Sequence, residues 1–197
     1  ASGVVEEIGS EVSLFKVGDR VSHASAPISG YSEKQIMPEE KLVTVPEGIS
    51  DEIASCILLK GITSEYLLHR SYAVKKGDKV LFHAAAGGVG QIFAQWAKSI
   101  GAKVIGTVGS DEKIEIAKAN GYEDVINYSK NDFAKEVMKL TDNNGVSAVF
   151  DGVGKNTFKG SIACLKPRGM MISFGNASGP LDPVNVTKDI QSKSLFL

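Results

Sequence analysis

Residues 79–90, which read Lys-Val-Leu-Phe-His-Ala-Ala-Ala-Gly-Gly-Val-Gly, constrain the fold of this chain more than any other stretch. An apolar segment typical of a buried strand ends in a turn of small residues, and the helical pattern of residues 91–100 follows at once. Gly87 and Gly90 occupy the second and third glycine positions of a G-x-G-x-x-G fingerprint, and Ala85 occupies the first. Such a turn lets backbone N–H groups and the positive end of a helix dipole face a pyrophosphate. The stretch therefore predicts a dinucleotide-binding turn, although the fingerprint alone is weakly specific.

The segment after this helix bears on which dinucleotide would bind. A second apolar strand is predicted at residues 103–108, and Gly109 and Ser110 follow it where a cofactor with a free ribose 2′-hydroxyl would favour Asp or Glu. Lys113 lies close by and suits a 2′-phosphate, which favours NADP(H) over NAD(H). Two observations leave the alternative open: Lys113 also fits a solvated helix residue, and Asp111 and Glu112 beside it argue against a strongly cationic pocket.

Composition excludes some classes of partner. With 22 basic and 23 acidic side chains the formal net charge is −1, which gives no electrostatic reason to expect nucleic acid or an anionic membrane surface. No apolar stretch reaches membrane-spanning length and the first residues do not resemble a signal peptide, so a cytoplasmic location is the default expectation. Cys56 and Cys164 are far apart and form no C-x-x-C pair, so neither a disulfide framework nor a structural zinc site is predicted.

The first part of the chain is predicted to be a small antiparallel β region. Strand candidates separated by turn signals occur at residues 3–8, 19–23, 31–37 and 41–45. Two helical stretches, 51–59 and 63–69, follow and are predicted to be interrupted near Gly61. Because both ends of the chain read as strands without a polar lead or tail, the sequence suggests an internal fragment of a longer protein.

From residue 79 onward, strands and helices alternate. The predicted strands are residues 79–84, 103–108, 125–127, 146–150, 170–174 and 194–197. The predicted helices are residues 89–100, 111–120, 133–141 and 157–165, with a short one near Lys188. Apolar strands alternating with amphipathic helices indicate an α/β fold with a doubly wound parallel sheet. Ligands bind beyond the carboxyl ends of such strands, where this sequence repeatedly carries small, polar or aromatic residues.

Several motifs together resemble a known family. They are residues 82–90, Gln95-Trp96-Ala97-Lys98, Gly106-Thr107-Val108-Gly109, Val125-Ile126-Asn127-Tyr128 and Ser173-Phe174-Gly175-Asn176. In order and spacing they are similar to the NADPH:quinone oxidoreductases, the zeta-crystallin-like, zinc-free branch of the medium-chain dehydrogenase/reductase superfamily. The resemblance covers essentially the whole chain. It implies part of a GroES-like catalytic domain with its connecting helix at residues 1–60, and an NADP-binding Rossmann domain at residues 61–197.

The resemblance also implies a set of cofactor contacts. Lys113 and Tyr128 match residues that hold the adenosine 2′-phosphate, and Thr63 matches one near the nicotinamide. The full set of implied cofactor-binding residues is Thr63, Ala86, Gly87, Gly88, Val89, Gly109, Ser110, Lys113, Tyr128, Val153, Phe174, Gly175 and Asn176. The cofactor expected on this resemblance is NADPH.

The metal question is decided by one position. Zinc alcohol dehydrogenases of the superfamily place a zinc-binding Cys four residues before the residue that matches Thr63, and this chain has Leu59 there. Leucine carries no donor atom for a metal, so a zinc-free reductase is expected. No convincing proton donor is found and no catalytic residue is assigned.

The implied reaction is hydride transfer from NADPH to a quinone or another small electrophilic acceptor. Two alternatives stay open: an NADPH-dependent reductase of activated alkenes such as 2-alkenals or enoyl thioesters, and a non-enzymatic nucleotide-binding, RNA-binding or crystallin-type role. The near-neutral charge makes nucleic acid an improbable partner. The resemblance further implies a homodimer formed through the last Rossmann strand, at residues 194–197.

Overall fold

The computed structural model describes residues 1–24, 27 and 30–197, and the chain forms two compact units, Ala1–Ile62 and Thr63–Leu197. Helix α1, Asp51–Tyr66, carries the boundary between them. The assignment of residues 1–60 to a catalytic domain and of residues 61–197 to a cofactor domain stays a prediction.

The N-terminal unit contains a small antiparallel sheet in the order β1-β2-β3. Its strands are β1, Ser2–Val4, β2, Arg20–Ser22, and β3, Val43–Thr44, and a 3₁₀ turn, η1, spans Glu39–Lys41. The strand predicted at residues 31–37 is wrong, because this segment forms no strand. Tyr31 and Ile36 are 109% and 94% exposed, so the apolar residues that suggested a strand have no core to face.

The predicted interruption of the connecting helix near Gly61 is also wrong. Helix α1 runs unbroken through Gly61 and is followed by a π-helical turn, η2, at Leu67–Ser71. A glycine inside a helix costs only about 1 kcal/mol relative to alanine, which the surrounding turns of a 16-residue helix can offset. Leu67 and Leu68, at the end of this helical segment, are fully buried in the C-terminal unit.

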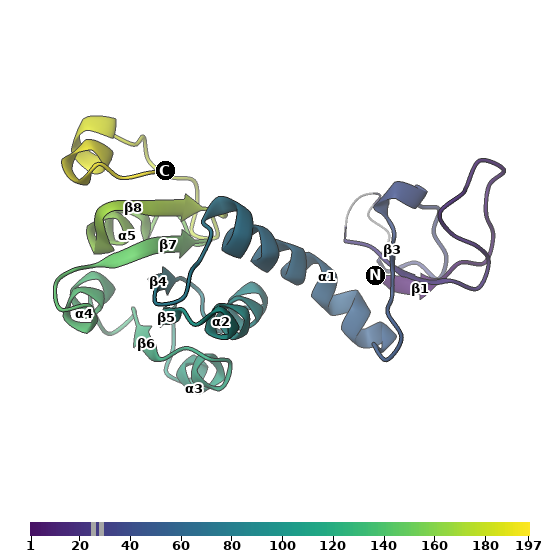
Figure 1. The fold of residues 1–197 in the computed structure, drawn as a ribbon, viewed down its shortest axis with the longest axis horizontal. Helices are drawn as coiled ribbons and strands as arrows, with labels where there is room; N and C mark the ends of the chain where they lie inside the picture. The colour runs from purple at the N-terminus through teal and green to yellow at the C-terminus, as the bar shows by residue number, and fades with distance from the viewer. Residues whose placement is uncertain (25–26, 28–29) are drawn as a thin grey trace. The chain divides into compact units, whose positions relative to one another are not determined.

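The C-terminal unit is built on a five-stranded parallel sheet in the order β6-β5-β4-β7-β8 (Figure 1). Its strands are β4, Lys79–Phe82, β5, Lys103–Val108, β6, Asp124–Asn127, β7, Val146–Asp151, and β8, Leu165–Ser173. The chain winds outward from β4 to β6 in one direction and then through β7 and β8 in the other. This order confirms the predicted doubly wound fold and places its switch point between β4 and β7, where ligands bind in such sheets.

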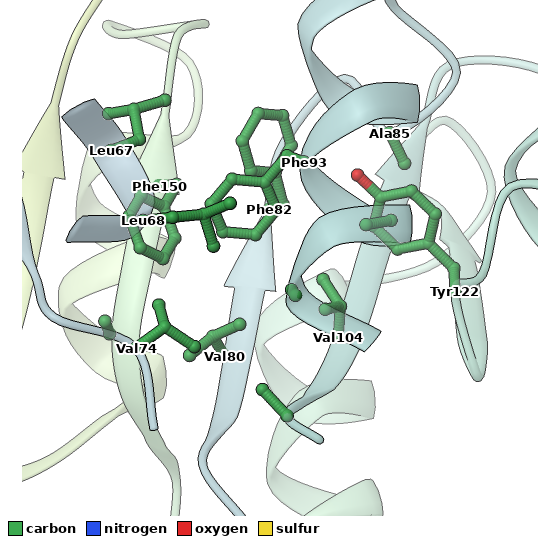
Figure 2. Packing of buried hydrophobic residues seen from close by; sticks show 14 of the residues in the cluster. Leu67, Leu68, Val74, Val80, Phe82, Ala85, Phe93, Val104, Tyr122 and Phe150 are labelled. Atoms are coloured by element: carbon green, nitrogen blue, oxygen red, sulfur yellow. The ribbon is translucent and has the colours of Figure 1, made fainter. Parts of the chain in front are cut away.

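Both faces of this sheet are covered by helices. The helices are α2, Gly88–Ile100, α3, Glu112–Ala119, α4, Phe133–Leu140, and α5, Phe158–Cys164. On one face, α2, α3 and η2 bury a cluster in which the Phe93 ring lies 4.6 Å from those of both Phe82 and Phe150 (Figure 2). On the other face, α4 and α5 pack on Leu81 and Val149. Alternate residues of β4 thus serve opposite cores, and each large buried side chain contributes about 1.5–3 kcal/mol.

The last part of the chain differs from its prediction in two places. Strand β8 starts at Leu165, earlier than the predicted residue 170, and passes through Arg168 in a left-handed conformation (φ 61°). After the helical turns η3, Val186–Ile190, and η4, Gln191–Lys193, the predicted strand at residues 194–197 is reduced to one parallel bridge between Met170 and Phe196. The segment therefore lies beside β8 but adds only a minimal strand to the sheet.

Candidate cofactor site

The turn between β4 and α2 presents backbone groups at the switch point of the sheet. Gly87 is the N-cap residue of α2, and its N–H donates to the Ala84 carbonyl oxygen at 2.8 Å. Ala84 holds a left-handed φ of 56°, which turns the chain sharply after the strand. Gly87 and Gly88 are exposed, whereas Ala86 and Val89 are half-buried. The turn therefore leaves the N-terminus of α2 exposed, and the binding of a pyrophosphate there stays a prediction.

Gly90 fixes how closely α2 approaches this turn. A Cβ atom at this position would lie 2.6 Å from the Ala85 carbonyl oxygen and 2.8 Å from that of Ala84. The Gly90 carbonyl oxygen also accepts a hydrogen bond of 2.9 Å from the buried Tyr122 hydroxyl. Burial raises the pKa of Tyr122 well above its usual value, so this hydroxyl stays a donor. Sequence reasoning had not identified Tyr122, whose role depends on a contact between distant segments.

The turns after β5 and β6 lie against each other. A Cβ atom on Gly109 would lie 2.9 Å from the Tyr128 phenol oxygen, and the Ser129 hydroxyl donates to the Gly109 carbonyl oxygen at 2.8 Å. Lys113 lies in the first turn of α3, where its N–H donates to the Ser110 carbonyl oxygen at 3.3 Å. Lys113 is exposed and Tyr128 is 42% exposed. Four residues predicted around a 2′-phosphate, Gly109, Ser110, Lys113 and Tyr128, thus gather at one edge of the sheet.

The loops after β7 and β8 form the other end of this edge. The Ala177 N–H donates to the Gly152 carbonyl oxygen at 3.2 Å, and the Ser178 N–H donates to that of Val153 at 2.8 Å. The Phe174 ring packs 5.7 Å from that of Phe82, so this side chain serves the core. What residues 174–176 and Val153 offer a ligand is therefore mainly their backbone.

Thr63 lies in the last turns of α1, beside the start of α2. Its neighbour Ser64 is fully buried and donates from its hydroxyl to the Val89 carbonyl oxygen at 3.3 Å. Thr63 itself is half-buried. The contact of Ser64 with Val89 brings Thr63 near the phosphate turn.

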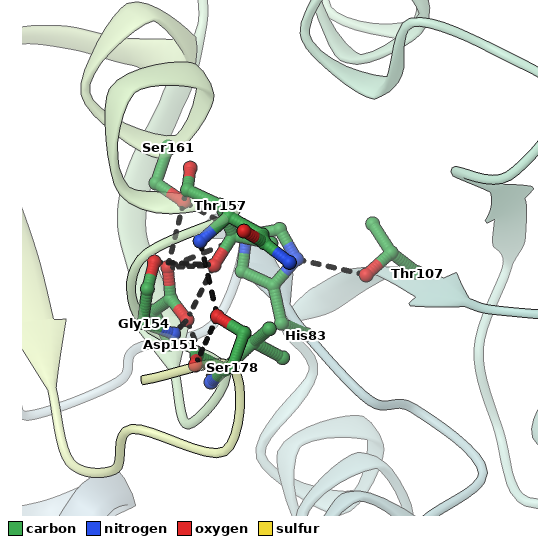
Figure 3. A network of polar contacts seen from close by, with 9 residues as sticks. His83, Thr107, Asp151, Gly154, Thr157, Ser161 and Ser178 are labelled. Carbon is green, nitrogen blue, oxygen red and sulfur yellow. Dashed lines mark hydrogen bonds and ion pairs between the residues drawn. The ribbon is translucent and has the colours of Figure 1, made fainter. Parts of the chain in front are cut away.

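A buried polar network lies at the ends of β4, β5 and β7, next to the turns that follow these strands (Figure 3). His83 Nδ1 lies 2.8 Å from Thr107 Oγ1, and His83 Nε2 lies 2.8 Å from Ser161 Oγ. Ser161 in turn donates to Asp151 Oδ2 at 3.0 Å, and Thr157 donates to the same oxygen at 2.7 Å. All five residues are at most 3% exposed. The network joins the carboxyl ends of β5, β4 and β7. Three of the turns described above start at these strand ends.

Asp151 anchors the loop that follows it. Its Oδ1 accepts the N–H groups of Val153 and Gly154 at 2.8 and 2.9 Å. The residue therefore shapes the turn after β7 and does not face a ligand, as expected of an Asp at a turn. Asp151 holds Val153, one of the predicted contacts, in place.

The hydrogen bonds determine the state of the His83 ring. The Ser161 hydroxyl donates to Asp151 Oδ2 or to the Thr157 carbonyl oxygen 2.9 Å away, so its proton points away from His83. The Ser161 oxygen then accepts a hydrogen bond from His83 Nε2–H, and the Thr107 hydroxyl donates a hydrogen bond to His83 Nδ1. Burial lowers the pKa of His83 to about 4, against the attraction of Asp151, so the ring is neutral near pH 7.

The buried histidine makes stability dependent on pH. Because the folded-state pKa of about 4 lies below the ordinary value of 6.5, the unfolded chain takes up a proton first as the pH falls. Stability that is full above pH 6.5 is thus lost progressively toward pH 4. We expect the free energy of unfolding from urea titrations to fall by about 2 kcal/mol more between pH 7 and pH 5 in the wild type than in His83→Gln. Equal losses in both proteins would contradict a neutral buried His83.

Comparison with known proteins agrees with this geometry. The sequence model of the family described as "Zinc-binding dehydrogenase" matches residues 88–196. A quinone oxidoreductase from Pseudomonas aeruginosa is 48% identical to this chain over 196 residues. A 2-haloacrylate reductase from a Burkholderia species is 46% identical over 200 residues. Each alignment covers 100% of this chain and 60% of the relative. The crystal structure of Escherichia coli quinone oxidoreductase complexed with NADPH superposes with a TM-score of 0.95 at 42% identity, covering 99% of this chain and 60% of that one.

This chain thus spans about 60% of the length of the relatives that it matches. The family match covers more than half of the chain, and it includes the helix that opens the phosphate turn and the turns after β5, β6, β7 and β8. The chain therefore belongs to the zinc-binding dehydrogenase family, on the quinone oxidoreductase branch of the medium-chain dehydrogenase/reductase superfamily.

Proposed function

We propose that the protein containing this chain transfers hydride from NADPH to a quinone without a metal ion. The observation that carries the proposal is that the turns after β5, β4 and β7 lie at the carboxyl edge of the sheet around its switch point, where Gly87 is exposed and Gly109 and Val153 are half-buried. Relatives named quinone oxidoreductase at 43–48% identity over this chain support it.

The residues at this edge fit NADPH. The phosphate turn offers the backbone N–H groups that open α2 to a pyrophosphate, and Lys113 with Tyr128 offers a cation and a hydroxyl beside the small turn at Gly109. The similarity to the E. coli enzyme complexed with NADPH supports the same choice. Thr63, Val153, Gly175 and Asn176 would then line the nicotinamide half.

The role of this chain in the reaction is orientation. NADPH, when bound, would supply the hydride, and the backbone of the loops after β7 and β8 would hold its nicotinamide half. Reduction of a quinone yields a stabilised phenolate that takes its proton from water, so the reaction makes little demand on a general acid. Accordingly, no side chain of this chain is assigned a catalytic role.

The donor set argues for a reaction without zinc. Leu59 has no atom that can bind a metal and stands where the zinc alcohol dehydrogenases have a cysteine. The family description therefore refers to relatives that bind zinc, and we propose that this protein does not. Metal analysis of the purified full-length protein tests this directly, and stoichiometric zinc would contradict it.

Reduction of activated alkenes is the second candidate, favoured by one specific observation. The 2-haloacrylate reductase from Burkholderia is 46% identical, close to the identity of the quinone oxidoreductases. Both reactions would use the same cofactor edge and differ in the acceptor pocket. We test them together by following the absorbance of NADPH with full-length protein and either an ortho-quinone or a 2-alkenal. Faster turnover of the alkenal would favour the second candidate, and NADPH binding without turnover would favour a binding or structural role.

The 2′-phosphate assignment is tested at Lys113. We expect Lys113→Ala to weaken NADPH binding by about tenfold while leaving NADH binding nearly unchanged, because only NADPH carries the phosphate that this ammonium group would contact. The dissociation constants are measured by titrating the nicotinamide fluorescence. An unchanged preference for NADPH would show that Lys113 is a solvated helix residue.

We also propose that the protein is a cytoplasmic homodimer joined along the segment at residues 194–197. Phe196 pairs with β8 through Met171 N–H to Phe196 O at 2.9 Å, yet remains 50% exposed, and Leu197 is 62% exposed. Such an apolar edge favours a covering partner. Among the residues that the structure describes, every helix is too short or too polar to cross a membrane. Sedimentation of the full-length protein at the mass of one chain would contradict the dimer.

A further inference from the structure

Asp111 directly follows Gly109 and Ser110, the positions at which an NAD-binding protein would favour an acid, and its carboxylate is held by neighbouring side chains. It follows the end of β5 by three residues and lies 21 residues after Gly90, close to the spacing of the acid that holds a ribose 2′-hydroxyl. We propose that Asn127 and Lys130 bind the Asp111 carboxylate as a specificity lock, which keeps it from the adenosine ribose and lets the site accept a 2′-phosphate. This inference rests on the proposed function.

The lock is built on a rigid element. Asn127 ends β6 and is 5% exposed, and its side-chain Nδ2 donates to Asp111 Oδ1 at 2.6 Å. The amide is fixed in turn because its Oδ1 accepts the Ser129 N–H at 3.0 Å. Lys130, on the same turn, donates from its ammonium group to Asp111 Oδ2. Both carboxylate oxygens are therefore directed to the turn after β6.

The carboxylate has no other structural role among the contacts of α3. Asp111 is the N-cap residue of this helix, but its side chain makes no capping hydrogen bond. Lys130 and Asn127 hold the pKa of Asp111 below its usual range, so the carboxylate stays ionised. Its ion pair with Lys130 is exposed and contributes little to stability, since such pairs are screened by water. The position of the pair is what suggests a function.

The location ties the lock to cofactor choice. Asp111 lies between Ser110 and Lys113, and the turn that binds it also carries Tyr128, whose hydroxyl lies against Gly109. A free carboxylate here would repel a 2′-phosphate and would accept a hydrogen bond from a 2′-hydroxyl, which favours NADH. Paired with Lys130, the Asp111 carboxylate adds no net charge, and the exposed Lys113 would remain as the cation available to a 2′-phosphate.

The test compares four forms of the full-length protein: wild type, Lys130→Ala, Asp111→Asn and the double variant. The readout is the ratio of the NADH to the NADPH dissociation constant, obtained from fluorescence titrations and independent of turnover. We expect Lys130→Ala to lower this ratio by about tenfold, because it leaves the negative charge of Asp111 uncompensated while Asn127 still binds Oδ1. Asp111→Asn alone should raise the ratio, because it leaves the Lys130 charge unpaired, and in the double variant the ratio should return to within about twofold of the wild type.

Three results would overturn the lock. A double variant as impaired as Lys130→Ala would mean that Lys130 contacts the phosphate itself. A lower ratio in Asp111→Asn alone would mean that the carboxylate itself favours NADPH. An unchanged ratio in Lys130→Ala would mean that the pair plays no part in selection.

Two controls distinguish failure of the lock from failure of the proposed function. They are a variant that removes a lysine far from the cofactor edge, and the wild type. Lys139 forms an exposed pair with Glu136 at 2.6 Å in the last turn of α4. That helix end lies at the amino end of β4, where Lys79 Nζ contacts the Leu140 carbonyl oxygen at 3.4 Å, opposite the cofactor edge. Lys139→Ala should therefore leave the ratio unchanged. If the wild type binds neither dinucleotide, the proposed function fails; if it binds NADPH but Lys130→Ala has no effect, only the lock fails.

Discussion

Replacing Gly90 by alanine is expected to lower the free energy of unfolding by about 3 kcal/mol and to remove measurable NADPH binding. The added Cβ atom would lie 2.6 Å from the Ala85 carbonyl oxygen and 2.9 Å from the carbonyl carbon. These are backbone atoms of the tight turn between β4 and α2, so no side-chain rotation can relieve the clash. Helix α2 must shift away from the strand, and overpacking of this kind costs about 1–3 kcal/mol or more.

Gly61 provides the matched control for this prediction. It also lies inside a helix, but a Cβ atom there would meet only Ile57 Cγ1, at 4.0 Å. Gly61→Ala should therefore raise stability slightly, by up to about 1 kcal/mol, because alanine favours the helix. Urea unfolding and NADPH titration of the two variants measure both effects. If Gly90→Ala were as stable as the wild type and bound NADPH normally, close packing of α2 would not be what positions the phosphate turn.

The sequence predicts the C-terminal unit well because its signals are local. The strands of a doubly wound sheet are buried on both faces and read as short apolar runs, and the helices between them carry an apolar stripe. Four of the five strands of the sheet lie within two residues of their predicted bounds. Strand β8 is the exception, since residues 167–169, Pro-Arg-Gly, read as a turn.

The N-terminal unit is predicted less well for the opposite reason. Residues 31–37 carry apolar side chains but leave Tyr31 and Ile36 exposed, and only a partner element would turn their pattern into a strand. Local helix propensity likewise predicts a helix break at Gly61 that does not occur. One glycine in a helix costs less free energy than ending the helix would. In both places packing, and not the local pattern, decides the structure.

The site shows the same division between local and distant signals. Gly87 and Gly90 follow from spacing alone, whereas the positions expected to face the 2′-phosphate and the nicotinamide come from the family resemblance. The hydrogen-bond network beneath them joins His83, Thr107 and Ser161, up to 78 residues apart in the sequence. In the sequence, the one hint of this network is His83 within an apolar segment. The sequence does not identify the residues that contact its ring. The environment of Asp111 is equally hidden in the sequence. Its closeness to Lys113 in the sequence argues against NADPH, and only the structure shows that Lys130 and Asn127 bind its carboxylate.

Asp151→Ala is expected to lower the free energy of unfolding by about 3–5 kcal/mol. The substitution removes a fully buried carboxylate and leaves its hydrogen-bond donors unpaired in the protein interior. The donors left without it are the N–H groups of Val153 and Gly154 and the hydroxyls of Thr157 and Ser161. The loop after β7 would then lose its anchor. We therefore also expect weaker binding of NADPH at temperatures where the variant remains folded.

Asp132→Ala separates the effect of burial from the loss of hydrogen bonds. Asp132 also accepts two backbone N–H groups, those of Ala134 and Lys135 at 3.1 and 3.3 Å, but it caps α4 at an exposed site. Water can satisfy these donors, so its removal should cost only about 1 kcal/mol. The same substitution with the same number of backbone partners then differs severalfold in cost, as measured by urea unfolding at pH 7. Equal costs would mean that the turn after β7 keeps its shape without the carboxylate, and that the network beneath the cofactor edge does not hold its loops.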